Sequence, residues 1–150
     1  MKTAEAIKTL GTAMGLPALA FDAENTCNLM IDDRQEIYLS GDPDGSVLRM
    51  HAVLGDATEL RADPTRMLEV NYNADESGGG ALSINRMTGE VVYVKSLDLT
   101  GHDAAGVTSA LETFLRYAAF WMEHVGTLSQ PVADPRLGGQ AGDAETIIRI

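Results

Sequence analysis

The sequence is poor in cysteine, in aromatic side chains and in positive charge, and it contains no long hydrophobic run. Its single cysteine, Cys27, permits no disulfide within the chain, which favours a reducing compartment. No stretch approaches the roughly 18 consecutive apolar residues of a transmembrane helix. Residues 1–5 also lack the apolar segment of a signal peptide. We therefore expect a cytoplasmic protein that does not enter a membrane.

Positive charge is outnumbered two to one, with 11 Lys and Arg residues against 22 Asp and Glu residues. The formal net charge of −11 repels polyanions, so we expect neither nucleic acid nor an anionic membrane as a partner. A basic or amphipathic polypeptide would instead be attracted to this surface.

Catalytic, metal-binding and cofactor-binding motifs are also missing. The aspartates around Pro43 lack the further ligands of a calcium loop and predict a turn. The glycine run opens a strand and not a helix, so it predicts a flexible loop instead of a phosphate site. Cys27 is expected to pack as a small hydrophobic residue, and the histidines are too scattered for a metal site. We predict no enzymatic activity, metal or cofactor. The aspartate segment is Asp42 to Gly45, the glycine run is Gly78 to Gly80, and the histidines are His51, His102 and His124.

Hydrophobic periodicity predicts one α+β domain with the element order αβββαββα and a twisted antiparallel sheet on which the helices pack. Three-to-four spacing of apolar residues predicts the first and last helices, and strict alternation predicts a three-stranded meander followed by a hairpin. We expect Thr3 and Thr100 to cap the first and last helices. The predicted elements are helix 3–15, strands 28–32, 36–40 and 46–54, helix 64–73, a hairpin over 81–97 and helix 102–126.

The short helix over residues 64–73 carries apolar side chains on more than one side. Asp63 is expected to cap it, with Pro64 at its first position. One side can pack on the sheet of the same chain, and the other predicts an interface with a second copy. The candidate dimer-interface residues are Met67, Leu68, Val70 and Tyr72.

The end of the chain differs in composition from the rest. Residues 127–150 are rich in Pro, Gly, Ala and Asp, and we expect a flexible tail after a domain over residues 1–126. The tail would be dispensable for folding, and if it docks, its anchors would be Ile147, Ile148 and Ile150.

The predicted elements carry more apolar surface than one thin domain hides easily, although a well-filled monomeric core remains an alternative. A dimer that offers grooves to a partner would use that surface. Alternation shows which residues share a face but not whether the first helix covers it. The candidate partner-binding residues are therefore Met14, Leu29, Met30, Ile31, Ile37, Leu39, Leu48 and Met50.

In this order and spacing, several short patterns together resemble type III secretion chaperones of the Tir-chaperone (CesT-like) family, class I. The patterns are Leu10-Gly11, Leu16-Pro17, residues 29–32, the helix end Leu68-Glu69-Val70-Asn71, residues 79–84 with 88–93, and residues 114–121. They span most of residues 3–125.

The resemblance implies a small, acidic, non-enzymatic homodimer that binds the amino-terminal chaperone-binding region of a secreted effector and keeps it export-competent. It also implies that the helix over residues 64–73 lies at the dimer interface, and that the meander and first helix bind the effector. Two other functions remain open: a regulatory protein of the same fold that sequesters another secretion component, and a small-ligand-binding α+β domain with a pocket beneath the glycine loop.

Overall fold

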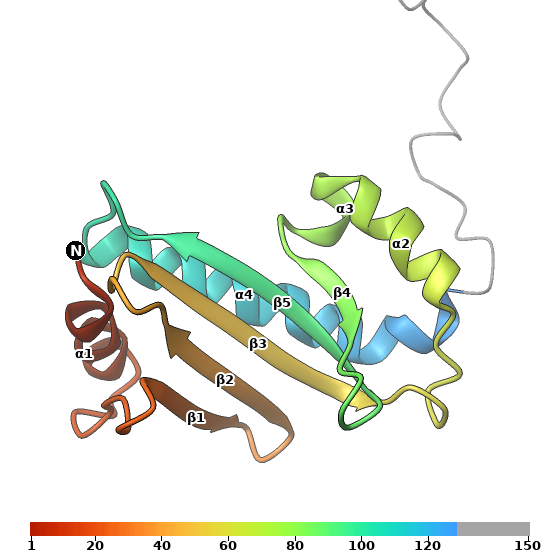
Figure 1. The fold of residues 1–150 in the computed structure, drawn as a ribbon, viewed down its shortest axis with the longest axis horizontal. Helices are drawn as coiled ribbons and strands as arrows, with labels where there is room; N and C mark the ends of the chain where they lie inside the picture. The colour runs from red at the N-terminus through yellow and green to blue at the C-terminus, as the bar shows by residue number, and fades with distance from the viewer. Residues whose placement is uncertain (129–150) are drawn as a thin grey trace, which may run out of the picture.

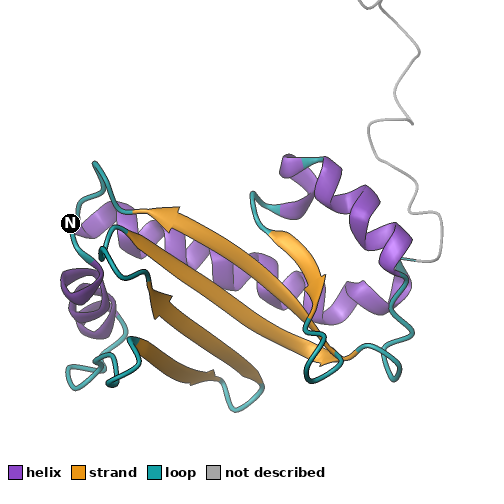
Figure 2. Ribbon diagram, viewed as in Figure 1, coloured by secondary structure: helices purple, strands orange, loops and turns teal. Residues whose placement is uncertain are grey.

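The computed structural model describes residues 1–128, which form one antiparallel sheet with a long helix across one face (Figure 1; Figure 2). The helices are α1 (Thr3–Ala13), α2 (Pro64–Tyr72), α3 (Ala74–Ser77) and α4 (Ala104–His124), followed by a 3₁₀ turn, η1 (Val125–Thr127). The strands are β1 (Thr26–Ile31), β2 (Gln35–Gly41), β3 (Val47–Asp56), β4 (Ala81–Ile84) and β5 (Glu90–Asp98). The predicted α+β class is confirmed.

The strands lie in the order β1-β2-β3-β5-β4, and every neighbouring pair is antiparallel. Because side chains alternate across a strand, the register places a row of core residues directly opposite one another. That row crosses all five strands at Leu29, Ile37, Ala52, Tyr93 and Leu82. The sheet therefore has one buried face, and β1 and β4 are its two edges.

Helix α4 lies behind β3 and β5 in Figure 1 and supplies the other half of the core. Its predicted apolar stripe is confirmed, and the ring of Phe114 stacks on that of Tyr93 with centroids 5.3 Å apart. The cap is Asp103 and not Thr100, because the Asp103 carboxylate accepts a hydrogen bond from the Gly106 amide at 2.8 Å. The buried residues of the stripe are Val107, Leu111, Phe114, Ala118, Trp121 and, just beyond the helix, Val125.

Helix α1 begins without a side-chain cap, so the prediction that Thr3 caps it is wrong. Thr3 is already helical and buried, and its amide donates to the Gly45 carbonyl at 3.0 Å. This bond ties the start of the helix to the β2–β3 turn.

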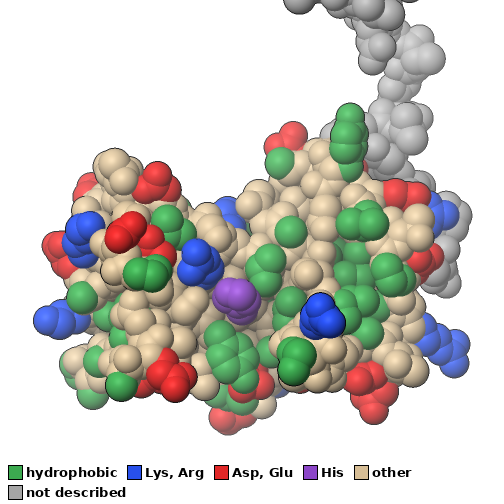
Figure 3. Space-filling model, viewed as in Figure 1, with side chains coloured by type: hydrophobic (Ala, Val, Ile, Leu, Met, Phe, Trp, Pro, Cys, Tyr) green, Lys and Arg blue, Asp and Glu red, His purple; other side chains and the backbone are tan. Residues whose placement is uncertain are grey.

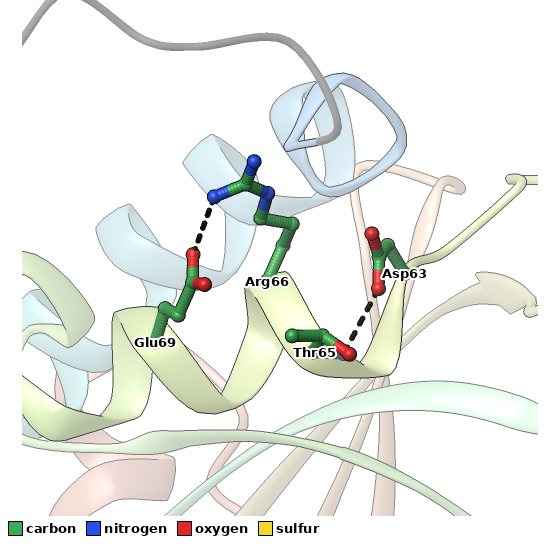
Figure 4. Close-up of polar contacts among 4 residues, drawn as sticks. All are labelled: Asp63, Thr65, Arg66 and Glu69. Carbon is green, nitrogen blue, oxygen red and sulfur yellow. Dashed lines mark hydrogen bonds and ion pairs between the residues drawn. The ribbon is translucent and has the colours of Figure 1, made fainter.

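Helix α2 begins as predicted. The Asp63 carboxylate accepts a hydrogen bond from the Thr65 amide at 2.9 Å, and Arg66 pairs with Glu69 at 2.7 Å one turn later (Figure 4). Both side chains of that pair are about half exposed, so the pair adds little stability. The capping bond is the contact that fixes where the helix starts.

The segment after α2 departs from the prediction of a flexible glycine loop. Asn73 caps the short helix α3, which the sequence interpretation missed, and Gly78 ends this helix in the left-handed region with φ of 70°.

Tyrosine side chains pack closely against the glycines that follow α3. A Cβ atom at Gly78 would lie 2.4 Å from the Tyr117 ring. The Tyr93 hydroxyl donates to the Ser77 carbonyl at 2.6 Å, and Lys95 donates to that of Gly78. These glycines permit close packing, and tyrosine rings fill the space beneath them.

The described fold extends slightly past the expected boundary at residue 126. Thr127 belongs to η1 and Leu128 is buried in the core. The remaining tail predictions, including the anchors Ile147, Ile148 and Ile150, fall on residues 129–150 and lie outside the described residues.

Candidate functional site

The structure corrects the predicted groove on the meander. The side chains of Ile37, Leu39, Leu48 and Met50 are all 0% exposed, and Leu29 is 9% exposed. They lie on the face of the sheet that packs against the helices, so four of the eight candidate partner-binding residues are fully enclosed core. Met50 is therefore a core residue and is not accessible to a partner.

The outer edge of β1 remains open, and the hydrogen bonds around it identify the backbone groups that point outward. The Asn25 carbonyl accepts from Gly41, the residue that ends β2, whereas the Thr26 carbonyl accepts from Asp22 outside the sheet. Since backbone direction alternates along a strand, Asn28 and Met30 point their amides and carbonyls away from β2. No other strand within residues 1–128 pairs with this edge.

Apolar side chains are exposed both on β1 and in the segment that ends and follows α1. Met30 is 57% exposed on one face of the strand, and Ile31 is partly exposed on the other. Met14 is half-buried, and Leu16, in the segment that follows α1, is 45% exposed. Unlike the enclosed candidates, Met14, Met30 and Ile31 are accessible to a partner.

A glycine in α1 sets the position of the segment that contains Leu16. The Leu16 amide donates to the Gly11 carbonyl at 2.7 Å, and a Cβ atom at Gly11 would lie only 2.6 Å from the Leu16 carbonyl oxygen. The chain can therefore fold back directly over the helix, which explains the pairing of Leu10-Gly11 with Leu16-Pro17 in the sequence.

The opposite edge of the sheet is closed by a side chain. The Asn71 carboxamide on α2 donates to the Leu82 carbonyl and accepts from the Leu82 amide, each at 2.8 Å. These two bonds imitate those of a neighbouring strand, so they satisfy the outward backbone groups at the centre of β4. The two edges therefore differ: Asn71 protects β4, whereas on the outer side of β1 Asp22 bonds Thr26 and no strand within residues 1–128 pairs with Asn28 or Met30.

The candidate interface residues on α2 separate into two sets. Met67 and Val70 are buried in the core of the same chain, so they are not available to a second copy. Leu68 is 69% exposed and Tyr72, one turn later on the same side, is 94% exposed. The outer face of α2 therefore carries two large unpartnered apolar groups.

The face of the sheet opposite α4 carries no helix within the described residues. Figure 3 shows hydrophobic side chains gathered on this face in the region of β4 and α2, with charged groups mostly toward its margins. His51 lies on this face in register between Tyr38 and Val94. Burial, together with the charge of Arg49, lowers the pKa of its imidazole. A neutral His51 therefore suits a half-buried surface.

The described residues contain no arrangement typical of a reaction centre. Within residues 1–128, no three His, Cys, Asp or Glu side chains cluster to hold a metal ion. Cys27 is buried, and burial followed by the charge of Asp22 raises the pKa of its thiol, which disfavours the nucleophilic thiolate. None of the helices in the same part of the chain combines the length and the hydrophobicity that a membrane-spanning segment requires.

A family model for the Tir chaperone protein (CesT) family matches residues 5–122. The match spans more than half of the chain, and the chain belongs to this family of type III secretion chaperones. The family is one of non-enzymatic chaperones, and we assign this chain no enzymatic activity. No curated protein matches the chain.

Solved structures of secretion chaperones share the fold. The ExsC–ExsE complex contains a chain with a TM-score of 0.70 at 16% identity, covering 83% of this chain and 97% of that one. The HopA1–SchA chaperone–effector complex gives 0.67 at 18% identity, with 79% and 91% covered. The ExoT–SpcS complex from Pseudomonas aeruginosa gives 0.57 at 25% identity, with 77% and 92% covered.

Sequence interpretation missed the role of Asn71. It lies inside the quoted pattern Leu68 to Asn71, but periodicity treats such a polar position simply as the end of an apolar helix. Its partner, Leu82, lies 11 residues further along the chain. The sequence signal that could have indicated this role is a polar residue near the end of a helix that directly precedes a hairpin.

Proposed function

We propose that this chain acts as a homodimeric chaperone that binds the amino-terminal region of a secreted effector in an extended form and keeps it soluble for export. The observation that carries the proposal is the unpaired edge of β1, which presents the backbone groups of Asn28 and Met30 beside exposed apolar side chains. An extended peptide can add to such an edge through main-chain hydrogen bonds and place alternate side chains on either face.

Energetics and charge favour a disordered client. A disordered segment loses conformational entropy when it is held extended, and strand pairing with several apolar anchors offsets that loss. Backbone pairing also tolerates varied sequences, which suits a chaperone that must hold an unfolded segment. The net charge of −11 attracts a basic or amphipathic client and keeps a protein with exposed apolar groups soluble.

The alternative of a small-ligand pocket beneath the glycine loop is not favoured, because Tyr93 and Tyr117 occupy that space. A regulator of the same fold that sequesters another secretion component would use the same edge, and the identity of the bound partner separates it from a chaperone.

Proline at position 30 tests the proposed edge. The Met30 amide points away from β2, so Met30→Pro removes an outward donor without breaking the sheet, and proline is tolerated in edge strands. Met30→Ser is the matched control, because it also loses the apolar side chain but keeps the amide. We expect Met30→Pro to weaken client binding at least about tenfold beyond Met30→Ser.

The measurement is the affinity of each variant for the amino-terminal regions of the secreted proteins encoded beside this gene, each co-produced with the chaperone. Unchanged melting temperatures verify that both variants are folded. Equal affinities of the two variants would show that β1 does not pair with the client, and failure of the wild-type protein to bind any of these regions would contradict the chaperone function.

For the dimer, we propose an interface on the outer face of α2. Val70 packs inside its own chain, so the informative substitutions are Leu68→Asp and Tyr72→Asp, which place charge on exposed positions without disturbing the core. In the dimer these carboxylates would be buried without partners, so we expect the equilibrium to shift to monomers near 16.0 kDa.

Sedimentation equilibrium measures this shift. Met87→Asp, an exposed change in the β4–β5 turn, serves as the control and should remain dimeric. A wild-type protein that is monomeric at micromolar concentration would contradict the proposed dimer, and a Tyr72→Asp dimer as stable as the wild type would place the interface elsewhere.

A further inference from the structure

A small pocket lies between the turn that joins β1 to β2 and the carboxyl-terminal half of α4. Its volume is about 110 Å³. Residues 31, 32, 34 and 35 come from the β1–β2 hairpin, and the other lining residues come from α4. Ile31 is the last residue of β1, so the pocket lies at the end of the strand that a segment added along that edge would pass. The lining residues are Ile31, Asp32, Arg34, Gln35, Ala119, Met122 and Glu123.

One side chain that lines this pocket carries a hydrogen-bond donor without an acceptor. Gln35 is only 6% exposed, and its Nε2 atom is buried with no hydrogen-bond partner among residues 1–128. Two other side-chain nitrogens in the described chain share this condition, on His102 and Trp121, but neither residue lines the pocket. Buried amide donors are normally paired, so Gln35 marks a place where an acceptor is expected.

The other lining residues restrict what kind of group can provide that acceptor. Ile31, Ala119 and Met122 form apolar walls, which favour an aliphatic stem. Asp32 and Glu123 outnumber Arg34, so the formal charge around the pocket is negative and disfavours a carboxylate. An aliphatic side chain would fill the walls but leave the Gln35 donor buried and unpaired.

We propose that this pocket is a specificity subsite for a carboxamide side chain, glutamine or asparagine, in the client segment that runs along β1. On binding, the Gln35 side chain turns so that its buried Nε2 donates to the carboxamide oxygen, the carboxamide amino group faces the carboxylates of Asp32 and Glu123, and the stem packs on Ile31 and Met122. This inference rests on the proposed function, because pairing with the open edge of β1 is what places the client beside the pocket.

The subsite gives the chaperone a means of choosing among clients. Strand pairing at β1 recognises backbone and is tolerant of sequence, so it cannot by itself distinguish one extended segment from another. A site built to hydrogen-bond a buried polar group rejects ligands that leave that group unpaired. The pocket therefore adds selectivity to an otherwise permissive edge.

A specificity swap tests the proposal. The probes are fluorescent peptides of about twelve residues, long enough to span β1, in which leucine alternates with threonine between terminal lysines. The central leucine is kept, or replaced by glutamine or by glutamate. For the wild-type dimer we expect fluorescence anisotropy to show the glutamine peptide binding about tenfold tighter than the leucine peptide, with the glutamate peptide weaker than the glutamine peptide.

The variant Gln35→Met replaces the carboxamide by an apolar side chain of similar length and removes the unpaired donor. We expect it to fold with an unchanged or higher melting temperature and to bind the leucine peptide at least as tightly as the glutamine peptide. The matched control Asn28→Met removes a carboxamide from an exposed position of β1, outside the pocket, and should keep the wild-type order of preference.

The outcomes separate this inference from the function on which it rests. If the wild-type protein binds none of the peptides at about 1 mM, the β1 edge itself is not a docking site. If it binds all three but does not prefer glutamine, or if Gln35→Met keeps the wild-type preference, the subsite is wrong while the edge remains. The wild-type order alone is decisive and needs no variant to fold.

Discussion

Replacing Met50 by glutamate is expected to unfold the protein or lower its melting temperature by at least about 10 °C. Met50 is fully enclosed between the sheet and the helices, so the substitution removes apolar packing and buries a carboxylate. An uncompensated buried charge costs about 3–5 kcal/mol, a large part of the stability of a typical domain. Thermal unfolding followed by circular dichroism measures the effect.

Lys95 lies opposite Met50 in the β3–β5 register, but its ammonium group is bound at the Gly78 carbonyl, to which it donates at 3.0 Å. Met30→Glu is the matched control, since the same change on an exposed edge position should alter stability by less than about 0.5 kcal/mol. A Met50→Glu protein as stable as the Met30→Glu protein would contradict this placement of the core.

The second large effect is expected for Asn71→Ala. The substitution removes both hydrogen bonds to Leu82 and leaves the buried amide and carbonyl of that residue without partners. We expect a loss of about 2 kcal/mol in the free energy of unfolding, measured by urea denaturation. Because β4 then becomes an open edge, the variant should also self-associate more readily than the wild type.

Asn28→Ala is the control for this change, because Asn28 is an exposed asparagine at the other edge of the sheet. Its stability should differ from the wild type by less than about 0.5 kcal/mol. Equal stabilities of the Asn71→Ala and Asn28→Ala proteins would mean that the Asn71 carboxamide does not protect the β4 edge.

The sequence predicts local features of this fold well. The capped start of α2 and the apolar stripe of α4 depend on residues within a few positions of one another, and the structure contains both. Alternation likewise finds all five strands to within about two residues, the usual uncertainty of element ends. Local chemistry is sufficient for such features because their partners are close in sequence.

Features that depend on tertiary packing are much less predictable. Alternation places Leu48 and Met50 on one face, but only the position of the helices decides that this face is core. The glycine run by itself predicts a flexible loop, whereas in the structure the rings of Tyr93 and Tyr117 fill the space beneath it. Asn71 protects the β4 edge and Gln35 lines the pocket. Both residues act through tertiary contacts, which no local sequence pattern specifies.

The central claim is that an extended client pairs with the outer edge of β1. Hydrogen exchange of individual backbone amides, measured by NMR with and without a bound effector amino-terminal region, tests it most directly. The account predicts that the amides of Asn28 and Met30 become protected by at least about tenfold, while the amide of Leu82, already bonded to Asn71, changes little. Protection at β4 with continued rapid exchange at Asn28 and Met30 would contradict the account.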